Sequence, residues 1–496
     1  MYVGGLSLIA VGLTTSVFLM NLAWVVLLAG WVAEGGWKAK MARGRESGLL
    51  MFFVALFVAH AAGMLWTENW QYGLYDIQKK LPLVAVPLVV LTSPPLGKKE
   101  MRGVMVPYCA AVFVVSLIGM GRYLAIERLP YREIVPFVSH IRFSLNVCLV
   151  LTMAFVALAR RGVGWWRRAL LVLLMVWFLF FLLLIRSYTA FVILALLPVA
   201  YFAKRRVGRV VCAAVYGALL VVVGSVVGWN VRSYYGPCRA DGPLVENGRY
   251  LFEGVDERSL AEHWPEYSAK PIDSANEYGY TLMSTVVRYL NSKGLEKNGE
   301  GLSRLSRHDI ENIENGVANE VQTHAFSVRA MVYSMVFEYE NYRTTGYIAE
   351  SSFLQRIELW KASLGVIRDH PLFGVGTGDV VDELHARLKE RRSSIAETTK
   401  HSHNQYLSLL MAFGVVGCVV AVAPLCIKGT KRSGGGWFRV VVWVIVLVSF
   451  LTEDTLETLA GVMFVALFVA LSGNVAEDVP GDGREGRIAG DGRNAA

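Results

Sequence analysis

Long apolar stretches recur along this chain, and they limit it to folds that belong in a membrane. More than half of the 496 residues are hydrophobic (54%), and only 18% are charged. A helix of about 20 predominantly apolar residues is long enough to cross a bilayer. Stretches of this kind lie at residues 48–66, 104–122, 141–159, 168–185, 187–203, 207–228, 404–427, 437–451 and 455–472.

Two further regions bring the predicted number of membrane helices to about twelve. The apolar run at 4–33 is too long for one upright helix, and polar residues occupy its centre at 14–16, so we expect two short helices there. The run at 81–93 contains two prolines, which favour a kinked span. The sequence therefore predicts an all-α protein that crosses the membrane many times.

Lysine and arginine concentrate in every second loop, which predicts the orientation of the chain. Loops rich in these residues stay on the cytoplasmic side of a membrane. The clusters are Lys38, Lys40, Arg43 and Arg45; Lys98, Lys99 and Arg102; Arg160, Arg161, Arg167 and Arg168; Lys204, Arg205, Arg206 and Arg209; and Lys428, Lys431, Arg432 and Arg439. The net charge of +9 follows from this topology, and no nucleic-acid footprint is visible. We expect an inner-membrane protein with both termini in the cytoplasm.

The same pattern divides the chain into four parts. Residues 1–228 and 404–473 are the two sets of membrane helices. The long polar segment 229–403 falls on the outer side and is expected to form a mainly helical domain. The tail at 474–496 is rich in Gly, Asp and Arg and is predicted to be disordered.

Three residues stand out at the predicted outer face of the membrane. His403 lies where the polar segment re-enters the bilayer, so it can exchange protons with water while its neighbours are desolvated. Arg186 ends a long apolar run, and Arg356 lies on a predicted helix of the outer segment. A guanidinium at this depth suits a diphosphate, which it can bind through paired hydrogen bonds. The residues taken singly also fit plainer roles, as interfacial anchors or surface charges.

Other polar residues on the same side are candidates for substrate contact. Lys80, His140 and Arg142 lie at the ends of predicted spans, and His401 and Asn404 flank His403. These residues could line the path of a lipid-linked donor. Lys and Arg at span ends are also the ordinary anchors of membrane helices, so both interpretations stay open.

Nothing in the sequence predicts a metal ion or another cofactor. The glycine-rich run at 374–378 has no preceding strand and no following Gly-Lys-Ser/Thr, so a nucleotide-binding loop is not indicated. We expect it to form a tight turn after Pro371 that needs residues tolerant of positive φ. The outer segment has no Asp-x-Asp or His-Glu cluster and a single cysteine.

The combination of these motifs resembles the O-antigen ligase and polymerase superfamily of bacterial membrane glycosyltransferases. The resemblance covers essentially the whole chain. Its three parts are Leu184-Ile185-Arg186-Ser187, with Ile185 where the family usually has serine; Arg356 and Trp360 before Pro371-Leu372-Phe373-Gly374-Val375-Gly376; and His403-Asn404 followed, after nine residues, by Gly414-Val415-Val416-Gly417. Three further stretches look like ligase-type members from Bacteroides-like bacteria: Glu246-Asn247-Gly248, Arg288 to Leu295, and Asp309 to Gly316.

The resemblance implies a multi-helix glycosyltransferase that needs no metal. Its donor would be a glycan on undecaprenyl diphosphate at the periplasmic face, and its acceptor a sugar hydroxyl of the lipid A–core. His403 would accept the hydroxyl proton, while Arg186 and Arg356 would bind the diphosphate and stabilise its charge as it leaves.

Other functions remain open alongside ligation. An O-antigen polymerase and a protein O-oligosaccharyltransferase would use the same donor chemistry. A polysaccharide flippase or transporter is an alternative of a different class, although the ionisable residues gather at one membrane face and do not line a path. The sequence does not indicate an oligomeric state.

Overall fold

The computed structural model describes residues 2–126, 129–159, 162–202, 206–236, 238, 243–275, 281–323, 328–346, 348, 352–397, 401–428 and 436–476. They fall into two compact units. The first is Met1–Arg209, Trp360–Arg387 and Lys400–Ala496, and the second is Val210–Leu359 and Leu388–Thr399. Most of the predicted tail, at 477–496, lies outside the described residues.

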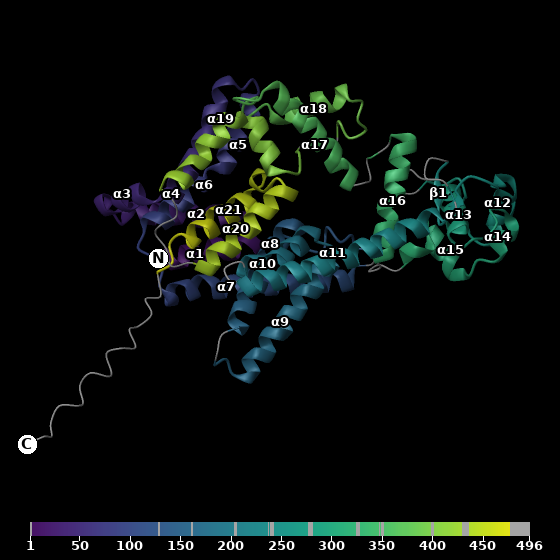
Figure 1. Ribbon diagram of the computed structural model, residues 1–496, viewed down its shortest axis with the longest axis horizontal. Helices are drawn as coiled ribbons and strands as arrows, with labels where there is room; N and C mark the ends of the chain where they lie inside the picture. The colour runs from purple at the N-terminus through teal and green to yellow at the C-terminus, as the bar shows by residue number, and fades with distance from the viewer. Residues whose placement is uncertain are drawn as a thin grey trace, which may run out of the picture. The chain divides into compact units, whose positions relative to one another are not determined.

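The first unit is built from helices. They are α1 (Tyr2–Thr15), α2 (Val17–Ala33), α3 (Trp37–Glu46), α4 (Gly48–Gly63), η1 (Met64–Trp66), α5 (Trp70–Lys80), α6 (Pro82–Thr92), α7 (Lys98–Ala125), α8 (His140–Leu158), α9 (Trp165–Leu184), α10 (Tyr188–Phe202), α19 (Gln405–Lys428), α20 (Gly436–Thr452), η4 (Thr455–Glu457) and α21 (Leu459–Ser472). Helix α21 is its central element, since every residue from Gly461 to Ser472 is buried (Figure 1).

The predicted break in the N-terminal apolar run is confirmed. Helix α1 ends at Thr15, and the side chain of Ser16 caps α2 by accepting a hydrogen bond from the backbone N–H of Leu19 (3.3 Å). A serine oxygen in this position satisfies one of the free N–H groups at a helix start. Two short helices therefore replace one long one.

The all-α fold is confirmed, whereas the number of membrane spans, about twelve, remains a prediction. Among the described residues, six helices are long and apolar enough to cross a membrane, or seven if the sharply bent pair α2 and α3 counts as one span. Four shorter apolar helices, including α20 and α21, fall below this length. Residues 82–92 form the short helix α6 with Pro87 inside it.

The second unit folds around its own core. Its elements are β1 (Val245–Glu246), β2 (Arg249–Tyr250), α12 (Glu257–His263), η2 (Trp264–Glu266), α13 (Leu282–Ser292), α14 (Gly299–Ser303), α15 (Arg307–Glu314), η3 (Glu320–Thr323) and α16 (Val328–Thr345). Trp264, Val286, Leu290 and Ile313 are buried at the centre of this core. Helices α11 (Arg206–Tyr235), α17 (Ser352–Asp369) and α18 (Val380–Glu390) cross from one unit to the other.

The three stretches that resemble ligase-type sequences build the scaffold of this second unit. Asn247 and Gly248, at φ 55° and 76°, form the two-residue turn between β1 and β2. The buried carboxylate of Glu246 accepts hydrogen bonds from Arg288 (3.1 Å from both Nε and Nη2) and from Asn319 (3.0 Å). Asp309 accepts hydrogen bonds from Tyr289 and Lys293, each at 2.7 Å. These residues hold the domain together.

Helix α19 is broken at Gly414, and the glycine-rich turn fills the break. Gly414 adopts φ 62° and ψ −166°, so the backbone hydrogen bonds of the helix are interrupted there. The carbonyls of Met411 and Ala412 accept instead from the N–H groups of Val375 (2.8 Å) and Gly376 (3.1 Å). In return, Pro371 and Leu372 accept from Val415 (2.9 Å) and Val416 (3.1 Å). Non-helical backbone at membrane depth requires such internal partners.

The backbone hydrogen bonds between residues 371–376 and 411–416, called here the interlock, explain in physical terms why the two motifs contain glycines. A Cβ atom on Gly414 would lie 2.3 Å from the carbonyl carbon and oxygen of Leu372. Gly374 and Gly376 adopt φ 68° and 98°, which confirms the predicted turn with positive φ. The turn also reaches α4, because Thr377 Oγ1 donates to the carbonyl of His60 at 2.7 Å.

We expect Gly414→Ala to destabilise the protein strongly. Overpacking costs about 1–3 kcal/mol, and the φ and ψ of Gly414, which essentially only glycine adopts, cost another residue a further 1–3 kcal/mol, roughly. The unfolding temperature of the detergent-solubilised protein measures the loss. Gly121→Ala is the matched control, since a Cβ there meets nothing within 4 Å. Equal unfolding temperatures for the two variants would contradict the proposed role of the interlock.

Candidate functional site

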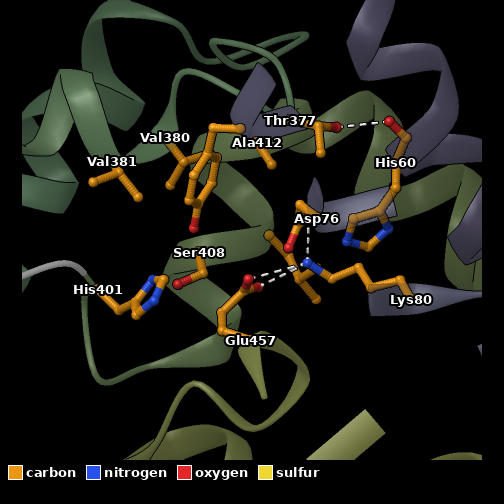
Figure 2. Close-up of a pocket in the computed structure, with 12 residues that line it drawn as sticks. His60, Asp76, Lys80, Thr377, Val380, Val381, His401, Ser408, Ala412 and Glu457 are labelled. Carbon is orange, nitrogen blue, oxygen red and sulfur yellow. Dashed lines mark hydrogen bonds and ion pairs between the residues drawn. The ribbon is translucent and has the colours of Figure 1, made fainter. Parts of the chain in front are cut away.

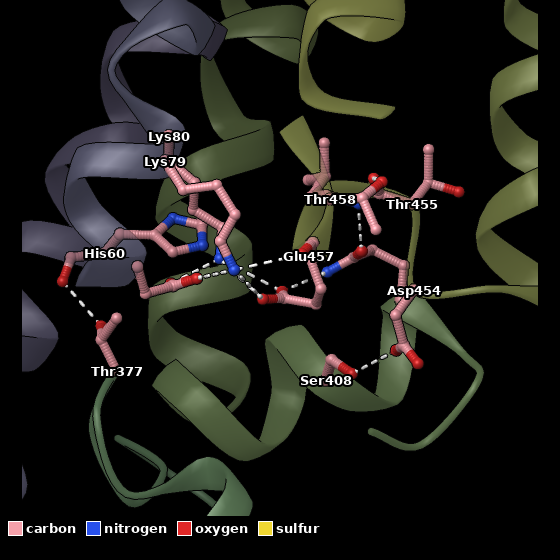
Figure 3. Close-up of polar contacts among 12 residues, drawn as sticks. His60, Lys79, Lys80, Thr377, Ser408, Asp454, Thr455, Glu457 and Thr458 are labelled. Atoms are coloured by element: carbon pink, nitrogen blue, oxygen red, sulfur yellow. Dashed lines mark hydrogen bonds and ion pairs between the residues drawn. The ribbon is translucent and has the colours of Figure 1, made fainter. Parts of the chain in front are cut away.

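The polar contacts of the first unit converge on residues 453–458, called here the 453–458 turn, which connects α20 to α21 (Figure 3). Arg142 of α8 is buried against it and donates hydrogen bonds to Thr458 Oγ1 (3.0 Å) and to the carbonyl of Asp454 (2.8 Å). Gln405 of α19 accepts from the N–H of Leu456 at 2.6 Å. The turn is therefore fixed by helices from both halves of the sequence.

Asp454 holds the backbone of His403 in an unusual conformation. His403 has φ 52°, and its N–H donates to Asp454 Oδ2 at 2.5 Å. The hydroxyls of Ser402 (3.1 Å) and Ser408 (2.6 Å) donate to Asp454 Oδ1. A left-handed backbone is unfavourable for a residue with a side chain, and such strain persists only where surrounding contacts impose it. The buried Asp454 supplies these contacts.

The His403 imidazole lies between a buried carboxylate and open space. Its Nδ1 is 3.6 Å from Glu453 Oε2, and the side chain of His403 is 39% exposed while that of Glu453 is 7% exposed. At this distance the carboxylate is not hydrogen-bonded to the ring, but it attracts the positive charge that the ring acquires when it takes a proton. This arrangement suits a base that takes a proton from a group arriving on the open side.

Asn404 and His401, the predicted neighbours of His403, have different surroundings. Asn404 Oδ1 accepts from the N–H groups of Tyr406 (3.0 Å) and Leu407 (3.2 Å), so it caps the start of α19. His401 lines a pocket with about 350 Å³ of empty space, part of it open to solvent (Figure 2). Burial lowers the pKa of His401, although Glu457 and Asp454 oppose this shift. Burial therefore favours the uncharged form of the His401 imidazole.

Lys80 lies on the wall of the same pocket and is almost fully buried, with 1% of its side chain exposed. Its Nζ is 2.5 Å from Asp76 Oδ2 and 3.1 Å from both carboxylate oxygens of Glu457 (Figure 2). Lys79 adds a 3.2 Å contact to Asp76 and donates to the carbonyl of Glu457 at 3.1 Å. Two lysines and two carboxylates thus balance each other.

The charges of Lys80 and Glu457 stabilise each other, whereas burial raises the pKa of Asp76 in spite of the two lysines. Burial disfavours the ammonium of Lys80, but attraction to Asp76 and Glu457 is stronger and raises the pKa of Lys80. Burial likewise disfavours the Glu457 carboxylate, yet Lys80 and Lys79 hold the pKa of this carboxyl well below its ordinary range. Lys80 and Glu457 are therefore both ionised in the folded protein at neutral pH.

Arg186 occupies the turn that ends α9. The N–H of Arg186 bonds to the carbonyl of Leu183 (3.1 Å) and that of Ser187 to Leu182 (3.3 Å), which is the Schellman pattern of helix ends. Arg186 takes the left-handed position of this motif, φ 49°, where glycine is usual. Among the described residues, only four non-glycine residues have positive φ, and Arg186 and His403 are two of them.

The exposed guanidinium of Arg186 shares an aromatic neighbour with His140. The Tyr131 ring lies 5.5 Å from the guanidinium carbon of Arg186 and 5.6 Å from the His140 ring. Next to Arg186, Ser187 donates to Ser144 of α8 at 2.7 Å, and Thr189 donates to Thr452 at 3.0 Å. Thr452 directly precedes Glu453. The structure therefore brings Arg186 and His140 to the flank of the turn that carries Glu453.

Arg356 lies in the second unit, on the part of α17 that precedes the unit boundary. It is half-buried, and two residues later Glu358 forms an ion pair with Arg391 (2.7 Å). Arg186 and His403 belong to the first unit, and the meeting of Arg356 with them stays a prediction.

Sequence reasoning missed the carboxylates Asp76, Glu453, Asp454 and Glu457. A signal was present, because 453–458 reads Glu-Asp-Thr-Leu-Glu-Thr between two apolar runs. Three carboxylates so close to hydrocarbon are costly without partners, so they mark a polar site. Within the described ranges, no three His, Cys, Asp or Glu side chains gather in a way that could hold a metal ion.

Comparison with known proteins identifies a family that this sequence matches. No curated protein matches the sequence. A protein family described as O-antigen ligase matches residues 170–422, just over half of the chain, and this region includes Arg186, Arg356 and His403. The match confirms the resemblance seen in the motifs and implies a membrane glycosyltransferase of the O-antigen ligase and polymerase type in the broad sense. The chain belongs to the O-antigen ligase family.

Proposed function

We propose that this protein is an O-antigen ligase that transfers a glycan from undecaprenyl diphosphate to a sugar hydroxyl of the lipid A–core. The observation that carries the proposal is the geometry of His403. Its ring is partly exposed and backed at 3.6 Å by the buried carboxylate of Glu453, and its backbone is held in a left-handed conformation by Asp454. Family membership supports the reaction class.

In the proposed reaction, the acceptor hydroxyl attacks the anomeric carbon of the donor sugar. A new carbon–oxygen bond forms to the acceptor, the bond to the diphosphate breaks, and its electron pair stays on the phosphate oxygen. His403 takes the hydroxyl proton on the ring nitrogen that does not face Glu453. Arg186 and Arg356 bind the diphosphate and stabilise the charge that develops on it.

The site is proposed to face the periplasm in the inner membrane. Arg43 donates to the carbonyl of Thr92 at the end of α6, and Lys40 donates to the carbonyl of Trp31, whose indole donates to Thr92 (2.9 Å). Leu96 accepts from the N–H of Ala476 beyond the end of α21 (3.1 Å). Lys80 and the 453–458 turn lie at the opposite ends of the same two helices. If the basic end is cytoplasmic, as the positive-inside rule requires, the candidate site opens to the other side.

Deletion of the gene in the native bacterium tests the proposed function. We expect the lipopolysaccharide ladder to disappear from gels while full-length lipid-linked polymer accumulates. Lipid A–core carrying a single repeat would indicate a polymerase instead. Intact lipopolysaccharide with unglycosylated proteins would indicate a protein O-oligosaccharyltransferase, and loss of donor transport with transfer retained would indicate a flippase.

Transfer by the purified protein is expected to continue in excess chelator and without ATP. A diphosphate is already a good leaving group, and two guanidinium groups can stabilise its charge without a metal ion. The measurement is the rate of product formation from a lipid diphosphate donor. Activity that chelation removes and Mg²⁺ restores would contradict this mechanism.

A further inference from the structure

We propose that Lys80 is a positioning residue, which holds the 453–458 turn so that Glu453 and Asp454 face His403. The inference rests on the proposed role of His403 as the base. The sequence suggests that Lys80 contacts the donor, and the inference gives Lys80 a different role.

The first observation is that carboxylate oxygens of the protein accept all the hydrogen bonds of the Lys80 ammonium group. All three of its described polar contacts are to carboxylate oxygens, one of Asp76 and two of Glu457, and only 1% of its side chain is exposed. An ammonium group has three N–H donors, so these contacts use its whole capacity. A phosphate could reach Lys80 only by displacing a buried carboxylate.

The second observation is the place of Glu457 in the chain. It lies three residues after Asp454 on η4, and Gln405 Nε2 also donates to it at 3.3 Å. Lys80 ends α5 and directly precedes α6, so the ion pair ties the turn to two helices far away in sequence (Figure 3). Arg142 fixes the same turn from α8. A shift of the turn would move both carboxylates that face His403.

Charge balance makes this role testable. Lys80→Met alone leaves Asp76 and Glu457 buried with only Lys79 as a cation, and breaking one side of a buried pair is strongly destabilising. Adding Glu457→Gln removes the surplus charge and leaves Lys79 paired with Asp76. Replacement of both members of a buried pair by neutral groups is often tolerated. The second substitution should therefore repair the first.

The experiment compares Lys80→Met with Lys80→Met/Glu457→Gln in the full-length protein. For Lys80→Met we expect kcat to fall about 10²-fold, since a displacement of about 1 Å can have this effect, with the KM for the donor nearly unchanged. The double variant should recover about tenfold or more. Lys38→Met, at an exposed lysine of α3, is the control and should behave as wild type.

Two outcomes of this comparison of rates would overturn the proposal. A raised donor KM with unchanged kcat in Lys80→Met would assign Lys80 to donor binding. Without Lys80 the unpaired Glu457 carboxylate would leave its buried position and displace the turn, whereas a neutral glutamine at 457 can stay there. A folded double variant that remains about 10² times slower than wild type would show that the unpaired charge of Glu457 does not displace the turn, which overturns the proposal. If Lys80→Met cannot be isolated, the kcat of the double variant is compared with that of wild type. A kcat within about tenfold of wild type supports the proposal, and one about 10² times lower contradicts it.

A readout independent of glycan transfer separates this inference from the proposed function. The rate at which diethyl pyrocarbonate modifies His403, followed by mass spectrometry, reports the environment of its ring. We expect this rate to change several-fold in Lys80→Met and to return in the double variant. A modification rate that stays the same in Lys80→Met would contradict the positioning role. If the rate changes in Lys80→Met and returns in the double variant, but the wild-type protein transfers no glycan, only the proposed function is contradicted.

Discussion

Replacement of His403 by asparagine is expected to abolish glycan transfer while the protein still folds and enters the membrane. Loss of a positioned general base lowers rates by about 10²–10⁴-fold. Asparagine tolerates a left-handed backbone, so φ 52° and the hydrogen bond to Asp454 can both persist. His403→Ala should also be inactive, with some additional loss of stability from backbone strain. Turnover by purified protein, compared at equal amounts of folded protein, measures the effect.

His401→Ala is the matched control for this prediction. His401 lines the pocket beside Glu457 and Ser408, outside the spacing of the family motif, so its loss should be milder. If His403→Asn transfers glycan at nearly the wild-type rate, then His403 is not the base. If His401→Ala shows the larger loss, the base would have to be sought in the pocket.

Features set by local sequence could be predicted. Polar residues at 14–16 marked the break capped by Ser16, and the glycines after Pro371 marked a turn with positive φ. Arg186 ends an apolar run, and the structure places it in the turn that closes α9. Each of these depends on backbone geometry or hydropathy over a few residues, which the sequence displays directly.

Contacts between distant segments could not be predicted in the same way. Lys80 and Glu457 are 377 residues apart, and nothing local to Lys80 distinguishes a buried ion pair from an interfacial anchor. The number of membrane spans likewise depends on how distant segments pack together. An apolar run of 14 residues such as α21 fits a membrane helix or a helix buried inside a bundle, and hydropathy alone does not separate the two.

Lysine is expected to be a poor substitute for arginine at both 186 and 356. If the two guanidinium groups bind the departing diphosphate, each offers a planar pair of N–H donors that lysine lacks. Losing such a contact should lower turnover by roughly 10²-fold or more. An arginine that only anchors the chain at the interface should be replaceable, because lysine also has a long apolar stem and a positive head. Turnover and donor binding of Arg186→Lys and Arg356→Lys distinguish these roles.

Arg186→Gly sharpens the test at the first position. Glycine is the preferred residue at the left-handed position of this helix end, so the variant should be at least as stable as wild type and yet inactive. Inactivity in a stable protein would show that the guanidinium serves chemistry and not the fold. Full activity in Arg186→Lys or Arg356→Lys would return that arginine to an anchoring role. The donor site would then have to be sought elsewhere, first at His140, which shares Tyr131 with Arg186.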